Sequence, residues 1–373
     1  MRVPLTVRIH VPSALAAARE STPAGPKVTA AEGEDLVLEM RDAAETSFDL
    51  LLDAMCLSRE VEDGARQRAA SDRVLVVDRM GWVKANALML TELLEHLDGP
   101  GSGTDGDRRT HSRGGLGTVL GAARRKLSSA RSGAEARSAG VQLGTVLGIL
   151  SRRVLGQYEP MRRPGALILN APTILAMEQR LQLNSRDFRL WVAFHETTHR
   201  VQLALAPWIR GEVVDRIGRL LNTEESLGDL LAQLPAALRG EVSLAHAALS
   251  VEGQRAMEDI TAIMTLLEGH ADVMMDRAGK RVIPSVSRIR RVFDASRRSD
   301  TGLRAAAMRL IGSEEKLAQY DDGAQFVRTV IRQAGMDGFN RVWSSPSALP
   351  SSSELQHPES WVSRVVPDTP GTV

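Results

Sequence analysis

The sequence predicts a mainly helical protein with a small β element. Two stretches carry apolar residues at helical spacing: residues 30–70, and the long segment from Asn184 to about residue 335. Short β-branched runs occur at Arg73–Asp78 and Gly165–Asn170. Long helical patterns set against two short strand candidates favour helices packed around a minor sheet.

The composition is that of an ordinary globular protein, and it excludes several classes of partner. The 373 residues are 43% apolar and 25% charged, with a net charge of +1 and a single cysteine, Cys56. This charge balance produces no field that would attract nucleic acid or an anionic membrane. One cysteine excludes an internal disulfide framework and any zinc site that needs several thiolates.

The localisation expected from the sequence is cytoplasmic. No apolar run reaches the length of a membrane span. Pro4, Thr6 and Arg8 interrupt the apolar stretch that an export signal would require. We therefore expect a soluble protein with no membrane partner.

Residues 1–98 are expected to be the N-terminal helical part of a single fold. Residues 30–70 are rich in alanine, leucine and glutamate, and they predict one or two helices. The strand candidate Arg73–Asp78 follows. Residues 82–97 then predict a further helix, which ends before Asp98-Gly99-Pro100.

The next segment, residues 99–139, is rich in glycine, serine and arginine, and we interpret it as a flexible loop or insertion. Gly140, Gly144 and Gly148 follow at intervals of four residues, on one side of a helix expected to run through Val154. Outside a membrane such spacing indicates close packing against another helix.

Residues 140–343 are expected to form the core of the fold, and residues 344–373 a C-terminal tail. Within the core, Gly165–Asn170 is the better strand candidate, and Pro172 opens a short helix. The tail is rich in serine and proline, so it is expected to extend over the surface, held by Trp343 and Trp361.

The motif that carries chemistry is His195-Glu196-Thr197-Thr198-His199, within a helix expected from Asn184 to Leu205. Residues four apart lie almost above one another on a helix, so both imidazoles can share one zinc ion. Glu196 stands about a quarter turn from His195. It can therefore lie beside the metal and take a proton from water.

The alternative is a solvated helix face on which two histidines happen to recur. Trp191, Phe194 and Val201 argue against it, because they indicate a largely buried helix. Two buried imidazoles without a metal would need other partners. Arg200 departs from the pattern, since the position after the second histidine is usually uncharged in zinc peptidase helices.

A catalytic zinc needs a third protein ligand and an open position for water. The metzincin continuation is absent, because Gln202 and Leu205 stand where glycine and a third histidine would be. Glu268 and Asp272, four residues apart on a later helix, offer an alternative. They resemble the E-x-x-x-D element of gluzincins, in which glutamate binds zinc and aspartate accepts a hydrogen bond from a ligand histidine.

Other assignments remain open around this element. Glu268 and Asp272 belong to a polar stripe, which is often a solvated helix face. His270 is the rival third ligand, although it projects from a different face of the helix. Tyr320 is the candidate for stabilising a developing oxyanion, although a lone tyrosine more often has a packing role.

Five segments carry a wider resemblance. They are VVDRMGWVKAN (76–86), LGILSRRVLGQYE (147–159), DFRLWVAFHETTHRVQ (187–202), LLEGHADVMMD (266–276) and GMDGFNRVWSSP (335–346). On these segments the chain resembles an actinobacterial family of zinc-dependent metallopeptidases, whose members are sometimes labelled as associated with deazaflavin-cofactor biosynthesis. The resemblance implies a zincin-like, gluzincin-type helical fold and zinc hydrolysis. His195, Glu196, His199 and the Glu268 segment fit the family pattern.

The leading interpretation is a zinc-dependent metallohydrolase, most simply a peptidase acting on a peptide or small amide. Zn²⁺ would be held by His195, His199 and Glu268, with Asp272 beside a ligand histidine and Glu196 as general base. The alternatives are a helical scaffold or binding protein with a structural zinc site, and a small-molecule amide hydrolase in a cofactor pathway. Glu196 favours hydrolysis, because a structural site needs no base.

Overall fold

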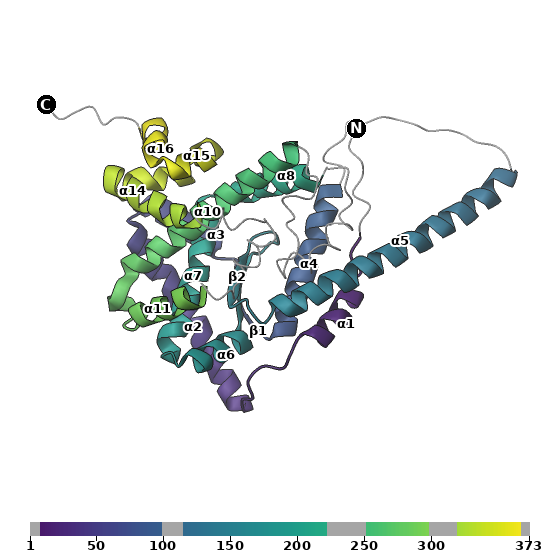
Figure 1. The fold of residues 1–373 in the computed structure, drawn as a ribbon, viewed down its shortest axis with the longest axis horizontal. Coiled ribbons are helices and arrows are strands. Elements are labelled where there is room, and N and C mark those ends of the chain that lie inside the picture. Colours follow the sequence, from purple (N-terminus) through teal and green to yellow (C-terminus); the bar gives the residue numbers. More distant parts are fainter. Residues whose placement is uncertain (1–7, 99–114, 222–250, 298–318, 367–373) are drawn as a thin grey trace.

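The computed structural model describes residues 8–98, 115–221, 251–297 and 319–366. Within these residues the helices surround a three-stranded sheet of order β1-β3-β2 (Figure 1). β1 (Arg73–Val77) is parallel to β3 (Ala166–Asn170), whereas β2 (Gly156–Glu159) is antiparallel to β3. The prediction of a mainly helical fold with a small β element is confirmed, and so are both strand candidates.

The N-terminal helices begin and end at local signals in the sequence. Thr29 and Glu32 form a capping box at the start of α2. Cys56 ends that helix in the left-handed conformation, with φ of 51°, so the predicted segment 30–70 divides into two helices. The helices before β1 are α1 (Val11–Ser21), α2 (Ala30–Met55) and α3 (Arg59–Ala69), and α4 (Arg79–Asp98) follows β1.

α5 (Gly115–Leu150) corrects the interpretation of residues 99–139 as a loop. Residues 115–139 are helical, whereas 99–114 lie outside the described residues. Glycine and serine favoured a loop, but leucine, alanine and arginine, which are strong helix formers, are interspersed among them.

The glycines near the end of α5 allow α1 to pack closely against it. A Cβ atom on Gly140 would lie 2.5 Å from the carbonyl oxygen of His10, and one on Gly144 would overlap the carbonyl group of Ala14. The predicted close packing of this glycine face against another helix is therefore confirmed.

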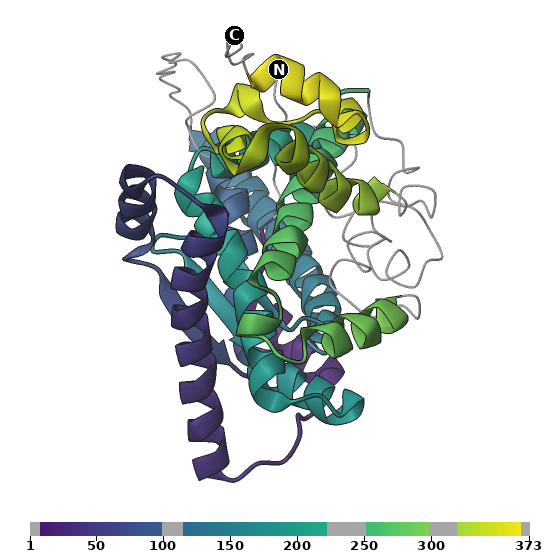
Figure 2. The ribbon, with the colours of Figure 1, turned by 90° about the vertical axis from the view of Figure 1, so that its left-hand side faces the viewer.

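In the described residues after the sheet, the helices match the long helical pattern predicted from Asn184; its parts at residues 222–250 and 298–318 lie outside the described residues. The Asn184 side chain caps α7 by accepting a hydrogen bond from the Asp187 amide. α2 and α10 both pack against α7, and the three helices run alongside one another in Figure 2. The helices are α6 (Ala171–Leu181), α7 (Ser185–Leu205), α8 (Ile209–Leu221), α10 (Val251–Val282), α11 (Val286–Arg297) and α14 (Gln319–Asn340).

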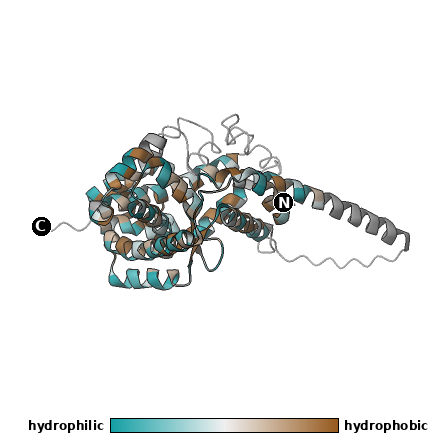
Figure 3. Ribbon diagram, turned by 90° about the horizontal axis from the view of Figure 1, so that it is seen from below, coloured by the Kyte–Doolittle hydropathy of each residue, from teal (hydrophilic) through white to brown (hydrophobic). Residues whose placement is uncertain are grey.

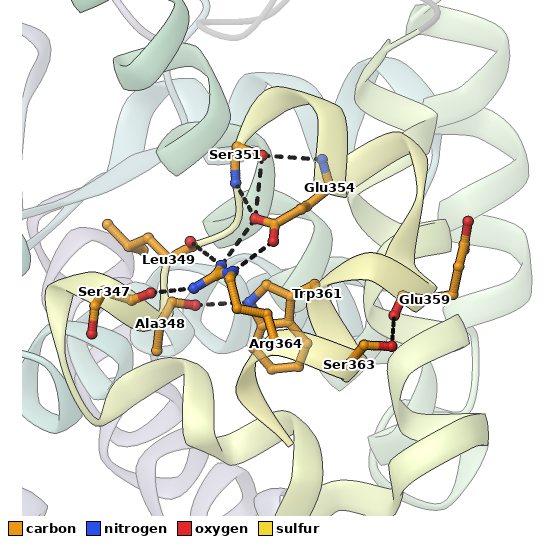
Figure 4. Close-up of polar contacts among 9 residues, drawn as sticks. All are labelled: Ser347, Ala348, Leu349, Ser351, Glu354, Glu359, Trp361, Ser363 and Arg364. Carbon is orange, nitrogen blue, oxygen red and sulfur yellow. Dashed lines mark hydrogen bonds and ion pairs between the residues drawn. The ribbon is translucent and has the colours of Figure 1, made fainter. Parts of the chain in front are cut away.

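The expectation of an extended C-terminal tail is also corrected, because its described residues, 344–366, fold into short helices. Trp361 is fully buried and donates from Nε1 to the Ala348 carbonyl, while Arg364 pairs with Glu354 (Figure 4). The predicted role of Trp361 as an anchor is confirmed. The elements are η2 (Arg341–Trp343), η3 (Pro346–Ala348), α15 (Ser352–Gln356) and α16 (Pro358–Val365).

The sheet lies between two hydrophobic cores, and β3 contributes to both. Leu167 and Leu169 belong to the larger core, with α2, α7, α10 and α14. Ala166 and Ile168 belong to the smaller one, with α1, α4 and α5. Hydrophobic and hydrophilic residues are interleaved along the helices (Figure 3). In the described part of the chain, no helix combines the length and apolar character needed to cross a membrane.

Candidate metal centre

The histidine motif lies on α7, where the sequence places it, and α7 packs against α2. Thr197 and Thr198 are fully buried, and the Thr197 hydroxyl donates to the Ala44 carbonyl of α2. His195 and His199 keep 21% and 15% of their side chains exposed. Thr197 thus links α7 to α2, while the imidazoles reach the solvent-accessible side of α7.

α10 brings Glu268 to the same place, through a close crossing with α14. A Cβ atom on Gly269 would overlap the backbone of Gly323, and one on Gly323 would overlap the Thr265 carbonyl. Glycine in a helix interior costs about 1 kcal/mol relative to alanine, so its presence at this crossing has a packing reason. The crossing sets the depth of α10, and with it the position of Glu268.

Three ligand atoms from the two helices converge. His195 Nε2 lies 3.5 Å from one Glu268 carboxylate oxygen, and His199 Nε2 lies 3.5 Å from the other. The two Nε2 atoms are 3.4 Å apart. Zinc bonds of about 2.0–2.1 Å in a tetrahedron place their ligand atoms about 3.3–3.4 Å apart. The donor set and its spacing therefore fit zinc, and this is the group in the described residues that can hold a metal ion.

The electrostatics of the metal-free cluster follow from the same contacts. Burial opposes the charged form of His195, but the hydrogen bond and charge of Glu268 outweigh burial and raise the pKa of His195 to about 9. The charges of Glu196 and Asp272 act in the same direction. The three carboxylates thus favour a positive charge at His195, as a metal-binding position requires.

Glu196 lies beside the three candidate ligand residues without belonging to that group. The residue is 9% exposed, and burial raises the pKa of its carboxyl group, against the opposing effect of His195 and His199. Strand β2 closes over it, because a Cβ atom on Gly156 would lie 2.8 Å from Glu196 Cγ. Glu196 is therefore a carboxyl group in a low-dielectric site, next to the place where a metal would be held.

His270, the rival third ligand, lies away from the histidine pair. It is fully buried, its ring stacks on Phe339, and its Nδ1 atom lies 2.9 Å from Gln202 Nε2. Burial and the nearby charge of His199 lower the pKa of His270 to about 3, so the ring is neutral. The structure therefore brings Glu268, and not His270, to the two histidines.

The remaining site predictions have different outcomes. Asp272 follows Glu268 by one turn and is partly buried, and its charge acts on His195. Tyr320 stands in the first turn of α14, but its side chain lies outside the described residues. Arg200 turns away from the metal position, because it pairs with Asp72 at 3.3 Å and lies over the Phe48 ring.

The sequence analysis did not identify two features of the candidate metal centre, Gln202 and strand β2. Gln202 entered only as a mismatch with the metzincin pattern, yet its side chain contacts His199 at 2.9 Å. The contact could have been predicted from the position of Gln202 three residues after His199, since residues three apart on a helix are neighbours. Strand β2 was also missed, because Gly-Gln-Tyr-Glu lacks the β-branched residues that mark strands.

The comparisons with known proteins concern nearly the whole chain. A crystal structure of "a putative hydrolase with a novel fold" from Chloroflexus aurantiacus is similar, with a TM-score of 0.60 and 26% identity. The alignment covers 95% of this chain and 98% of that chain. A search of curated proteins finds no match. The narrower resemblance to actinobacterial, deazaflavin-associated members stays a prediction. The model of the zincin-like metallopeptidase family matches residues 9–362, and the chain belongs to that family.

Proposed function

We propose that this protein is a zinc-dependent peptidase in which His195, His199 and Glu268 hold the metal and Glu196 is the general base. The observation that carries the proposal is the spacing of 3.4–3.5 Å among the two histidine Nε2 atoms and the Glu268 carboxylate. The carboxyl group of Glu196, which follows His195 on α7, lies beside them. Membership of the zincin-like metallopeptidase family supports a zinc metallohydrolase.

The chemistry follows from these residues. Zinc supplies a Lewis acid that polarises a substrate carbonyl and makes water more acidic. Glu196 takes a proton from the water whose oxygen forms the new bond to the carbonyl carbon. It then gives that proton to the amide nitrogen as the carbon–nitrogen bond breaks. The raised pKa of Glu196 suits it to hold the proton between these two steps.

The neighbouring strand favours a peptide as substrate. β2 is an edge strand in the order β1-β3-β2, and its first residue, Gly156, lies against Glu196. An extended peptide can add to such an edge through backbone hydrogen bonds. The absence of a side chain at Gly156 lets the backbone of β2 approach Glu196 closely. A small amide would gain nothing from this edge.

The decisive comparison is between wild-type protein and Glu196→Gln, measured as zinc content and as hydrolysis of peptides and of small amides. We expect about one zinc per chain in both proteins, since Glu196 is not a ligand. Turnover of peptides should fall by about 10²–10⁴-fold in the variant.

The matched control is Glu178→Gln, which changes a glutamate that is also buried but pairs with Arg189, away from the cluster. It should retain peptidase activity. Full activity of Glu196→Gln would contradict the assigned base. Small amides cleaved in place of peptides would favour the cofactor-pathway alternative. Zinc without any hydrolysis would favour the structural scaffold.

A further inference from the structure

Gln202 connects the two helices that carry the candidate ligands. The residue is fully buried on α7, one turn after His199. Its Oε1 atom lies 2.9 Å from His199 Nδ1. Its Nε2 atom donates to the Leu267 carbonyl on α10 at 2.9 Å, and lies 2.9 Å from His270 Nδ1. All the hydrogen-bonding atoms of this amide therefore have partners.

The Leu267 carbonyl determines which way this amide points. A backbone carbonyl only accepts hydrogen bonds, so the group facing it must be the NH₂ of Gln202. The Oε1 atom then faces His199, and an oxygen acceptor requires a proton on His199 Nδ1. A neutral imidazole that carries its proton on Nδ1 has its lone pair on Nε2, the atom that faces His195 and Glu268.

His270 completes the arrangement. The second hydrogen of the Gln202 amide needs an acceptor, which His270 Nδ1 provides. The proton of His270 must then be on Nε2, and that atom is buried without a partner. A buried polar atom without a partner is unfavourable and needs a reason. Holding the Gln202 amide supplies one, and the ring is fixed between Phe339 and Trp343.

We propose that Gln202 is a positioning residue that fixes His199 in the tautomer able to bind the metal, and that the Leu267 carbonyl and His270 fix Gln202. The proposal rests on the zinc site of the proposed function. Because Leu267 precedes Glu268, the same contact also aligns α10 with α7. Gln202 thus controls the orientation of one ligand and the distance to another.

The test measures zinc affinity by competition with a chelator, at constant pH, for three variants. Gln202→Leu removes the acceptor and the donors at similar size, and should weaken zinc binding about 10- to 100-fold. His270→Phe removes only the acceptor for the second hydrogen, so its effect should be smaller. Gln157→Leu is the matched control, because Gln157 bonds with Trp82 and Asn86 on the other side of the sheet. It should leave zinc affinity unchanged.

Folded Gln202→Leu protein with wild-type zinc affinity would overturn the positioning role. So would an equal loss in Gln157→Leu, because the effect would then be general destabilisation. Wild-type protein that binds no zinc would instead contradict the proposed function, so the two failures are distinguishable.

If Gln202→Leu does not fold, the His199 tautomer can be tested on the wild-type protein. In zinc-loaded protein with ¹⁵N-labelled histidine, we expect a His199 Nδ1–H signal that exchanges slowly with solvent, because Gln202 Oε1 accepts it. A His199 ring bound to zinc through Nδ1, or an Nδ1–H signal in fast exchange, would overturn the proposal.

Discussion

The two faces of the sheet pack helices in a similar way but differ in what they bury. On one face, α1 and α5 cross closely at Gly144, and that side buries apolar residues such as Trp82 and Val146 together with the polar residues Asn86 and Ser151. On the other face, α10 and α14 cross closely at Gly269, and that side also buries Gln202 and His270. The same kind of close helix crossing stabilises a helix pair on the first face, and on the second face it also sets the positions of candidate ligand residues.

The largest effect expected from this comparison concerns a ligand. His199→Ala removes one of three candidate metal ligands, so zinc affinity should fall by more than the roughly 10- to 100-fold effect of a supporting residue. Metal content measured by mass spectrometry checks this. The matched control is His10→Ala, on the other face, where His10 accepts from the Ser13 amide and caps α1. It should alter stability modestly and zinc content not at all. Zinc retained in His199→Ala would contradict the ligand set.

The second prediction compares the two crossing glycines. Gly144→Ala and Gly269→Ala each introduce a Cβ atom that overlaps backbone of a facing helix. Overpacking costs about 1–3 kcal/mol, so both variants should unfold at lower denaturant concentration despite the better helix propensity of alanine. Only Gly269→Ala should also weaken zinc binding, because it displaces Glu268. Equal zinc affinity in the two variants would show that the crossing of α10 does not control the site.

The last prediction concerns the pH dependence of zinc binding by the wild-type protein. The pKa of His195 is about 9 in the metal-free protein, above its ordinary 6.5, because the contact with Glu268 outweighs burial. Its contribution to the stability of that form is therefore fully present below about pH 6.5 and is lost as pH rises through about 9. Zinc needs the neutral ring, so zinc affinity should rise by about tenfold per pH unit up to about pH 9 and then level off.

Chelator competition at several pH values, with proton release measured by calorimetry, checks the pH dependence. Glu268→Gln is the informative variant, because without the carboxylate the pKa of His195 should fall and the residual affinity should level off at a lower pH. Zinc affinity that does not change between pH 7 and 9 would contradict the His195–Glu268 contact in the metal-free protein.

Much of the fold was predictable because its signals are local. The capping residue Asn184, the β-branched run at Arg73–Val77 and the glycine spacing on α5 each act within a few residues of sequence. The two incorrect interpretations, at residues 115–139 and 344–366, come from composition, since glycine, serine and proline were taken as signs of loop and extended chain. Packing outweighs such preferences, as the burial of Trp361 shows.

The sequence by itself determined the histidine pair and the adjacent carboxylate, because the period of a helix fixes the relative positions of residues one and four apart. It left Glu268 and His270 as rivals, since both lie on one helix and its rotation about its own axis is not a local property. Only the tertiary structure decided between them. The crossing of α10 with α14 turns Glu268 towards the two Nε2 atoms, and it places His270 against Gln202 and Phe339. Contacts across 60 to 70 residues of chain depend on packing, which no short sequence pattern encodes.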